Sequence, residues 1–248
     1  PDAVRWAVAS AQERGVIVTL ATGRMFASTR PLAESLNITA PLITYNGALV
    51  QDLAGNRYFE QLVSPKHAVE LAEIAAAEGV TLNLYVDDTL YVAEWNADVD
   101  YYLTIAQVEP RVVGDLVDFA RSLPQASGVL KALFVVAPGQ RDELWTRLRR
   151  CYEGQLEVVT SNPRFIELTA LGISKGRALA ALAERLNIRP EQVMAAGDNF
   201  NDLTMAEYAG LGVAVGDAPP ELKAVADVVV GTSREAGIAD AIQRYVLK

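Results

Sequence analysis

A short apolar run that leads straight into a polar loop indicates the fold class of this chain. Val193-Met194-Ala195-Ala196 is followed at once by Gly197-Asp198-Asn199-Phe200-Asn201-Asp202, which carries two carboxylates and two amides. Such a run is typical of a buried strand, and α/β proteins bind ligands in the loops at the carboxyl ends of parallel strands. Hard oxygen ligands suit Mg²⁺, which binds one or two carboxylates together with substrate phosphate. The segment therefore predicts an α/β protein with a magnesium site at a strand end.

Helical patterns alternate with short apolar runs at both ends of the chain. Residues 3–14 have the spacing of an amphipathic helix that stops at Gly15, and residues 16–20 predict a buried strand. A helix at 25–36 and a strand at 41–45 follow. From residue 174 the alternation resumes, with helices at 175–186, 202–208, 219–225 and 235–246 and strands at 193–197, 211–215 and 227–230. This alternation predicts a parallel sheet of the α/β class.

The middle of the chain has a different pattern. After a helix at 65–78, two strands at 82–86 and 89–93 flank Asp87-Asp88, which predicts an antiparallel hairpin with a two-residue loop. The segment continues with a strand at 129–136, a helix at 140–150 and strands at 156–160 and 164–168. We therefore expect a core domain formed by residues 1–60 and 169–248, with an α+β domain of residues 61–168 inserted into it.

Composition argues against several classes of function. The net charge of −9 disfavours a nucleic-acid partner held by a basic surface. No run of about 18 apolar residues indicates an ordinary transmembrane helix. The single cysteine, Cys151, allows no intrachain disulfide, and nothing points to secretion. We expect a cytoplasmic protein without a nucleic-acid or membrane partner, and the sequence leaves its oligomeric state open.

Three motifs follow one another along the chain. They are Thr19-Leu20-Ala21-Thr22-Gly23-Arg24, Ile173-Ser174-Lys175-Gly176 and Gly197-Asp198-Asn199-Phe200-Asn201-Asp202. Together they resemble motifs II, III and IV of the haloacid dehalogenase superfamily. The insertion between II and III, preceded by residues 44–48 (TYNGA), resembles the Cof-type phosphatases with a C2B cap. Residues 212–218 also match that family, except that Asp217 stands where asparagine is usual. The resemblance implies a parallel, Rossmann-like core with an inserted C2B-type α+β cap.

The resemblance also implies an activity, which is phosphoryl transfer through an aspartyl-phosphate with Mg²⁺ as the cofactor. Such chemistry depends mostly on positioning and on neutralisation of charge. By this resemblance Thr22 donates its hydroxyl and Gly23 its backbone N–H to the transferring phosphoryl group. Lys175 supplies positive charge to the phosphate and the nucleophile. Asn46, which ends a strand, would face the phosphate or the substrate together with Gly47.

The remaining site residues come from motifs II and IV. Asp198 would ligate Mg²⁺ directly. Asp202 would support the metal either through a bridging water molecule or by holding the groups that ligate it. Asn201 would orient Asp198 or Lys175 beside the phosphate. Arg24 could reach a substrate phosphate or carboxylate, with a salt bridge inside the core as the alternative. For Asp202 the alternative is a role in capping the helix that follows it.

One motif of the family is absent from the given chain. Motif I, D-x-D-G-T, supplies the nucleophile and the general acid/base, and no such segment precedes the helix at 3–14. We expect the natural protein to carry it upstream of Pro1. Asp87-Asp88-Thr89-Leu90 is similar only superficially, because it lies between alternating strands rather than after a buried one.

The sequence thus predicts a Mg²⁺-dependent phosphatase of small phosphorylated metabolites, with sugar phosphates as the expected substrates. Three alternatives remain open. The chain could be a phosphomutase, a phosphatase dedicated to one phosphorylated sugar conjugate, or a catalytically dead module that still binds phosphate.

Overall fold

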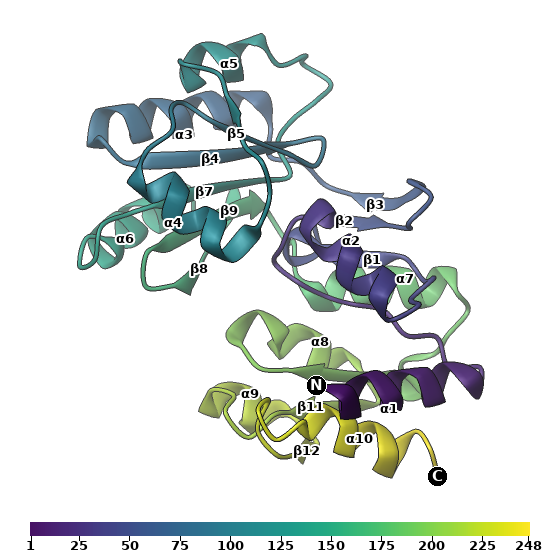
Figure 1. Cartoon of the computed structure of the whole chain (residues 1–248). Helices are drawn as coiled ribbons and strands as arrows, with labels where there is room; N and C mark the ends of the chain where they lie inside the picture. The colour runs from purple at the N-terminus through teal and green to yellow at the C-terminus, as the bar shows by residue number, and fades with distance from the viewer. The chain divides into compact units, whose positions relative to one another are not determined.

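The computed structural model describes residues 1–248, with the exception of the side chain of Ser161. The chain forms two compact units, which Figure 1 shows in the context of the whole chain. The first unit consists of Pro1–Gly23, Thr29–Phe59 and Ser174–Lys248, and the second consists of Arg24–Ser28 and Glu60–Ile173. Among the helices of the described residues, none is both long and apolar enough to cross a membrane.

The first unit draws its elements from both ends of the chain. It contains, wholly or for the most part, α1 (Asp2–Glu13), α2 (Phe26–Ser35), β1 (Leu42–Thr44), β2 (Leu49–Gln51), β3 (Arg57–Glu60), α7 (Lys175–Arg185), β10 (Met194–Gly197), α8 (Leu203–Tyr208), β11 (Leu211–Ala214), α9 (Pro220–Val225), β12 (Val228–Val229) and α10 (Gly237–Tyr245).

A parallel sheet lies at the centre of the C-terminal part of this unit. Its strand order is β10-β11-β12, and both neighbouring pairs are parallel. Val213 of β11 packs in one cluster with Leu222 of α9 and Ala241 of α10, so the helices that follow each strand cover the sheet. Helix α1 packs on α10 through its apolar stripe, which includes Ala7 and Val8 (Figure 1). The parallel sheet and its helices confirm the predicted α/β class.

Residues 16–20 do not form the strand that the sequence predicts. Only the end of this segment pairs: Ala21 makes a parallel bridge to Ile43, whose N–H donates to the Leu20 carbonyl at 2.9 Å. Val16 and Ile17 are exposed. An apolar run becomes a strand only where a neighbour supplies hydrogen bonds along its length, and the described residues supply them only at its end. β1 instead pairs antiparallel with β2, in a sheet of order β1-β2-β3.

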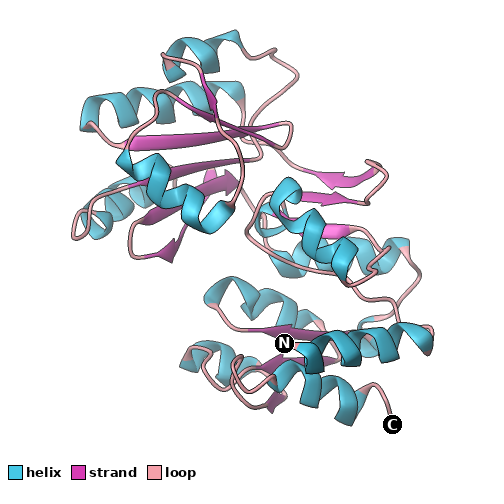
Figure 2. Ribbon diagram, viewed as in Figure 1, coloured by secondary structure: helices cyan, strands magenta, loops and turns pink.

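The second unit is an α+β structure built on one sheet, and Figure 2 distinguishes its strands from its helices. Its elements are α3 (Pro65–Glu78), β4 (Thr81–Val86), β5 (Thr89–Val92), α4 (Ala97–Ala106), β6 (Arg111–Val112), α5 (Leu116–Ser122), β7 (Lys131–Val135), α6 (Arg141–Cys151), β8 (Leu156–Asn162) and β9 (Phe165–Ala170). The strand order is β6-β5-β4-β7-β9-β8, antiparallel except between β5 and β6.

The predicted hairpin is confirmed. β4 and β5 are antiparallel, with Val86 opposite Thr89 and only Asp87 and Asp88 between them. Both turn residues have positive φ, +47° and +56°, as a tight two-residue turn requires and as aspartate tolerates. The Asp88 carboxylate also accepts a hydrogen bond from the N–H of Phe26 at 2.9 Å, which ties the segment 24–28 to this unit.

Candidate active site

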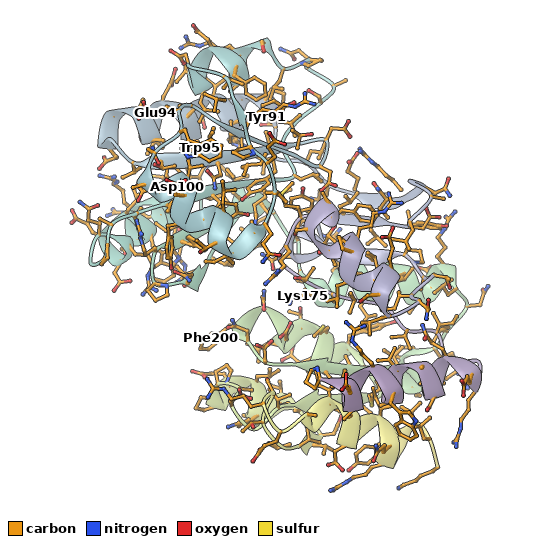
Figure 3. The ribbon with its side chains drawn as sticks, viewed as in Figure 1. Tyr91, Glu94, Trp95, Asp100, Lys175 and Phe200 are labelled. Atoms are coloured by element: carbon orange, nitrogen blue, oxygen red, sulfur yellow. The ribbon has the colours of Figure 1, made fainter. Side chains whose placement is uncertain are left out.

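A buried ion pair in the first unit joins Lys175, in the second of the three motifs, to Asp202, in the third. Lys175 is the first residue of α7, where Ser174 caps the helix by accepting a hydrogen bond from the N–H of Arg177. The Lys175 ammonium contacts Oδ1 of Asp202 at 2.6 Å, and the two residues are 6% and 2% exposed. Because a buried charge is costly without a partner, this pair fixes the lysine at the end of β10. Figure 3 labels Lys175 together with Phe200 of the loop that carries Asp202.

Asp202 uses its other oxygen to shape the loop. Oδ2 accepts the backbone N–H groups of Asp198 and Asn199, at 2.9 and 3.0 Å. The side chain folds back under the strand end because Gly197 has no Cβ; a Cβ there would lie 2.4 Å from that of Asp202. Asp202 therefore closes a capping box on the short 3-10 helix Phe200–Asp202, of which it is the last residue, while it also holds Lys175. Its side chain does not cap α8, the helix that follows it, so the alternative role expected from the sequence is not observed.

Asp198 follows the carboxyl end of the same strand, and its side chain reaches the surface although protein atoms partly surround its carboxyl group. Partial burial of its carboxyl group, together with the charge of Asp202, raises its pKa above the ordinary value, although the Lys175 ammonium acts in the opposite direction. Asp217, beyond the end of the neighbouring strand β11, adds to the same effect. The carboxylates around Asp198 thus outweigh the single lysine, so that a cation would stabilise its ionised form.

Two asparagines connect this loop to the end of β1. Nδ2 of Asn201 donates to Oδ1 of Asn46 at 2.9 Å. Asn46 is buried and has a left-handed conformation, with φ of +58°, inside the 3-10 helix Tyr45–Gly47. Gly47 follows with φ of +105°, and a Cβ at this position would lie 2.4 Å from the Ser174 carbonyl oxygen. Only glycine therefore allows this turn to pack against the start of α7.

Thr22 and Gly23, in the first of the three motifs, lie beside Asn46. The Thr22 carbonyl accepts the N–H of Asn46 at 3.0 Å, and the Thr22 N–H donates to the Ile43 carbonyl at 2.9 Å. A Cβ on Gly23 would approach Oδ1 of Asn46 to 2.7 Å. The structure thus connects Thr22, Gly23, Asn46, Gly47, Lys175, Asp198, Asn201 and Asp202 through neighbouring contacts in the first unit. Arg24 is exposed and belongs to the second unit.

One supporting residue was not singled out from the sequence. Thr204, in the first turn of α8, accepts the N–H of Gly176 through its hydroxyl at 3.0 Å. A Cβ on Gly176 would lie 2.2 Å from the Thr204 carbonyl oxygen, so the two helices touch through backbone here. The glycine after Lys175 was the only sequence signal of this close approach.

The residues at this site fit a hard cation such as Mg²⁺. Oδ1 of Asn201 is buried and has no hydrogen-bond partner among the described residues. The described side chains include no group of three or more His, Cys, Asp or Glu placed to hold a metal. Mg²⁺ needs only one or two protein carboxylates, because waters and substrate phosphate complete its shell. Asp198 is the carboxylate that could ligate it directly, since both Asp202 oxygens already accept hydrogen bonds.

Comparison with known proteins agrees with this arrangement. A family model described as haloacid dehalogenase-like hydrolase matches residues 1–242. The 5-amino-6-(5-phospho-D-ribitylamino)uracil phosphatase YcsE of Bacillus subtilis is 32% identical over 99% of this chain and 88% of its own. The pyridoxal phosphate phosphatase YbhA of Escherichia coli is 28% identical, covering 97% and 90%. The crystal structure of a haloacid dehalogenase-like hydrolase from Bacteroides thetaiotaomicron superposes with a TM-score of 0.89 at 28% identity, covering 98% of this chain and 92% of that one.

Proposed function

Because this chain belongs to the haloacid dehalogenase-like hydrolases, we propose that it is a Mg²⁺-dependent phosphatase of small phosphomonoesters, sugar phosphates in particular. Two relatives support the substrate class, since their names give a phosphoribitylamino-uracil and pyridoxal phosphate as substrates, both of them small phosphomonoesters. We further propose that residues 1–60 and 169–248 are the catalytic core and that residues 61–168 are its cap.

The contact between Lys175 and Asp202 is the observation that carries the proposal. It holds a buried ammonium group next to the loop that presents Asp198. Phosphoryl transfer needs positive charge close to the transferring group, and this acidic chain offers it at this strand end through Lys175. A lysine at the first position of α7 also adds the favourable field of a helix N-terminus.

In the proposed reaction an aspartate of the expected segment upstream of Pro1 attacks phosphorus, the ester P–O bond breaks and the alcohol leaves. Water then hydrolyses the aspartyl-phosphate, which releases inorganic phosphate and restores the carboxylate. Thr22 binds a phosphoryl oxygen through its hydroxyl, and Gly23 binds one through its N–H. Lys175 offsets the negative charge of nucleophile and phosphate, while Asn46 and Asn201 face the phosphate. Asp198 would hold Mg²⁺, and Asp202 would orient both Lys175 and the Asp198 backbone. When bound, the metal supplies charge neutralisation of the phosphoryl oxygens.

The test uses the full-length protein, including any segment that precedes Pro1. p-Nitrophenyl phosphate and a panel of sugar phosphates are assayed across a Mg²⁺ titration for the wild type, Asp198→Ala and Lys175→Ala. We expect Asp198→Ala to lose Mg²⁺-dependent turnover, and Lys175→Ala to stay impaired at any Mg²⁺ concentration. Lys66→Ala, on the exposed side of α3, is the matched control for loss of a lysine.

Two results would contradict the proposal. Undiminished turnover in Asp198→Ala, or full rescue of Lys175→Ala by metal, would show that these roles are assigned wrongly. A wild-type protein that binds inorganic phosphate but turns over no phosphomonoester would instead identify a binding module.

A further inference from the structure

Lys175 is held at both ends by the segment that follows β10. Its ammonium contacts Oδ1 of Asp202 at 2.6 Å, so the tip of the side chain is fixed. Two residues later in the same segment, the Thr204 hydroxyl accepts the N–H of Gly176 at 3.0 Å, and that N–H belongs to the peptide bond that follows Lys175. One short stretch, residues 202–204, therefore holds both the side chain and the backbone of the lysine.

The hydrogen bond of Gly176 joins two helices at the residue next to Lys175. The first N–H groups of a helix have no acceptor within it, and the residue that precedes the helix commonly supplies one. At α7 that residue is Ser174, whose hydroxyl accepts the N–H of Arg177 at 3.1 Å. The N–H of Gly176 is satisfied instead by Thr204, which lies on a different helix, α8. The start of α7 is thus tied to α8 as well as to its own cap.

The close approach of the two helices depends on the glycine. A Cβ on Gly176 would lie 2.2 Å from the Thr204 carbonyl oxygen and 2.8 Å from the Thr204 Cβ, so only glycine lets the hydroxyl reach this N–H. Gly176 is buried, and a buried N–H without an acceptor destabilises the fold. Thr204 itself is exposed, so its contribution is that of the hydroxyl rather than of buried apolar surface.

These contacts indicate a role in the proposed reaction. Phosphoryl transfer depends on the position of the charges around the transferring group, and a displacement of about 1 Å can lower the rate about 100-fold. We propose that Thr204 is a positioning residue, which acts through Gly176 to hold Lys175 in place for the phosphate, and this role rests on the proposed function. Thr204 does not hold the metal-binding loop in the same way, because the N–H of Asp198 donates to Asp202.

Thr204→Val is the variant that tests this role in the full-length protein, and Thr204→Ser is its conservative partner. Valine has the shape of threonine but puts a methyl group where the hydroxyl lies 3.0 Å from the Gly176 nitrogen, and apolar contacts need about 3.5–4.0 Å. Gly176 must therefore move, and Lys175 moves with it. We expect kcat for p-nitrophenyl phosphate to fall roughly 10-fold or more in Thr204→Val and to stay near the wild-type value in Thr204→Ser, which keeps the hydroxyl.

Two further readouts separate the positioning of Lys175 from damage to the metal site or to the fold. The Mg²⁺ concentration that gives half-maximal activity should not change in Thr204→Val, because the N–H of Asp198 keeps its bond to Asp202. Acetylation by acetic anhydride, followed at Lys175 by mass spectrometry, needs no turnover. A buried lysine reacts only when it is released, so its rate in Thr204→Val should rise roughly 5-fold or more, the factor that corresponds to one net hydrogen bond.

Asp227→Ala is the matched control for the loss of such a bond. Oδ2 of Asp227 accepts the N–H of another buried glycine, Gly212, at 2.7 Å near the start of β11. The control should lower stability while kcat and the acetylation of Lys175 stay at their wild-type values. If Thr204→Val is insoluble, Thr204→Ala is read in the same way, because it also lacks the hydroxyl.

Three results would overturn the inference. Wild-type kcat in Thr204→Val would show that the hydroxyl is not needed. A fall in kcat without faster acetylation would show that Thr204 does not act through Lys175, and an equal fall in Thr204→Ser would show that the hydroxyl is not the group that matters. If the wild type hydrolyses no phosphomonoester, the proposed function fails, and the acetylation of Lys175 alone decides whether Thr204 holds it.

Discussion

Removal of the Asp202 carboxylate should destabilise the first unit strongly. In Asp202→Ala the Lys175 ammonium stays buried, where it is 6% exposed, and loses the oxygen that it contacts at 2.6 Å. The N–H groups of Asp198 and Asn199 lose their acceptor at the same time. The variant therefore breaks the ion pair and opens the capping box of the loop.

The size of the effect follows from the burial of the pair. Removal of one partner of a buried ion pair costs about 3–5 kcal/mol, because the other charge remains without compensation. For a chain of this length that loss corresponds to a fall in Tm of about 6–20 °C. An exposed pair in the same unit provides the comparison. Asp240 and Arg244 on α10 are in contact at 2.7 Å but largely exposed, and Asp240→Ala should cost about 0–1 kcal/mol.

Urea unfolding and thermal melts of the two variants measure the difference. The double variant Lys175→Met/Asp202→Leu removes both charges and should recover most of the loss, because apolar residues of similar volume often replace a buried pair without cost. If Asp202→Ala loses no more stability than Asp240→Ala, the pair does not anchor the loop and this reasoning is wrong.

Three further predictions concern other parts of the chain. Mg²⁺ should raise the Tm of the wild type but not of Asp198→Asn, because the carboxylate that a cation would neutralise is gone; equal shifts in both would exclude Asp198 as the ligand. Gly47→Ala should destabilise the protein, since a Cβ would lie 2.4 Å from the Ser174 carbonyl oxygen, and urea unfolding should show a larger loss than for Gly55→Ala, where φ is +93° but the space is open. Burial and the nearby Glu70 raise the pKa of Tyr152 from 10.0 to about 12, so above pH 10 the unfolded chain releases a proton that the folded chain keeps. Stability should therefore fall as pH rises from 10 towards 12, and urea titrations of Tyr152→Phe should show a weaker fall.

Local signals in the sequence were sufficient for several elements. The predicted helix at 65–78 is observed as Pro65–Glu78, because Ser64 caps its start, Pro65 suits its first position and Gly79 ends it with a positive φ. The Asp87-Asp88 turn was predicted correctly for the same reason, since its conformation depends on the two turn residues themselves. The motifs around Thr22, Lys175 and Asp198 likewise identified the family from residue type and order alone.

Other features depended on partners that a sequence does not reveal. Residues 16–20 have the composition of a buried strand, yet a strand exists only where neighbours supply hydrogen bonds, and here only its end is paired. The strands β2 and β3, of three and four residues, are too short to show a periodicity. Helices α4 and α5 are held by segments elsewhere in the chain, since Asp98 of α4 accepts a hydrogen bond from Thr81 and Leu116 of α5 packs in one cluster with Leu71 of α3.

Tertiary structure also determined which role each carboxylate of the candidate site can take. The sequence presents Asp198 and Asp202 as two similar carboxylates four residues apart. Folding buries Asp202 against Lys175 and leaves Asp198 exposed. Asp202 therefore holds the lysine in place, and Asp198 remains available to a cation. Residue type thus determined which chemistry was possible, and the packing of distant segments determined which residue carries it.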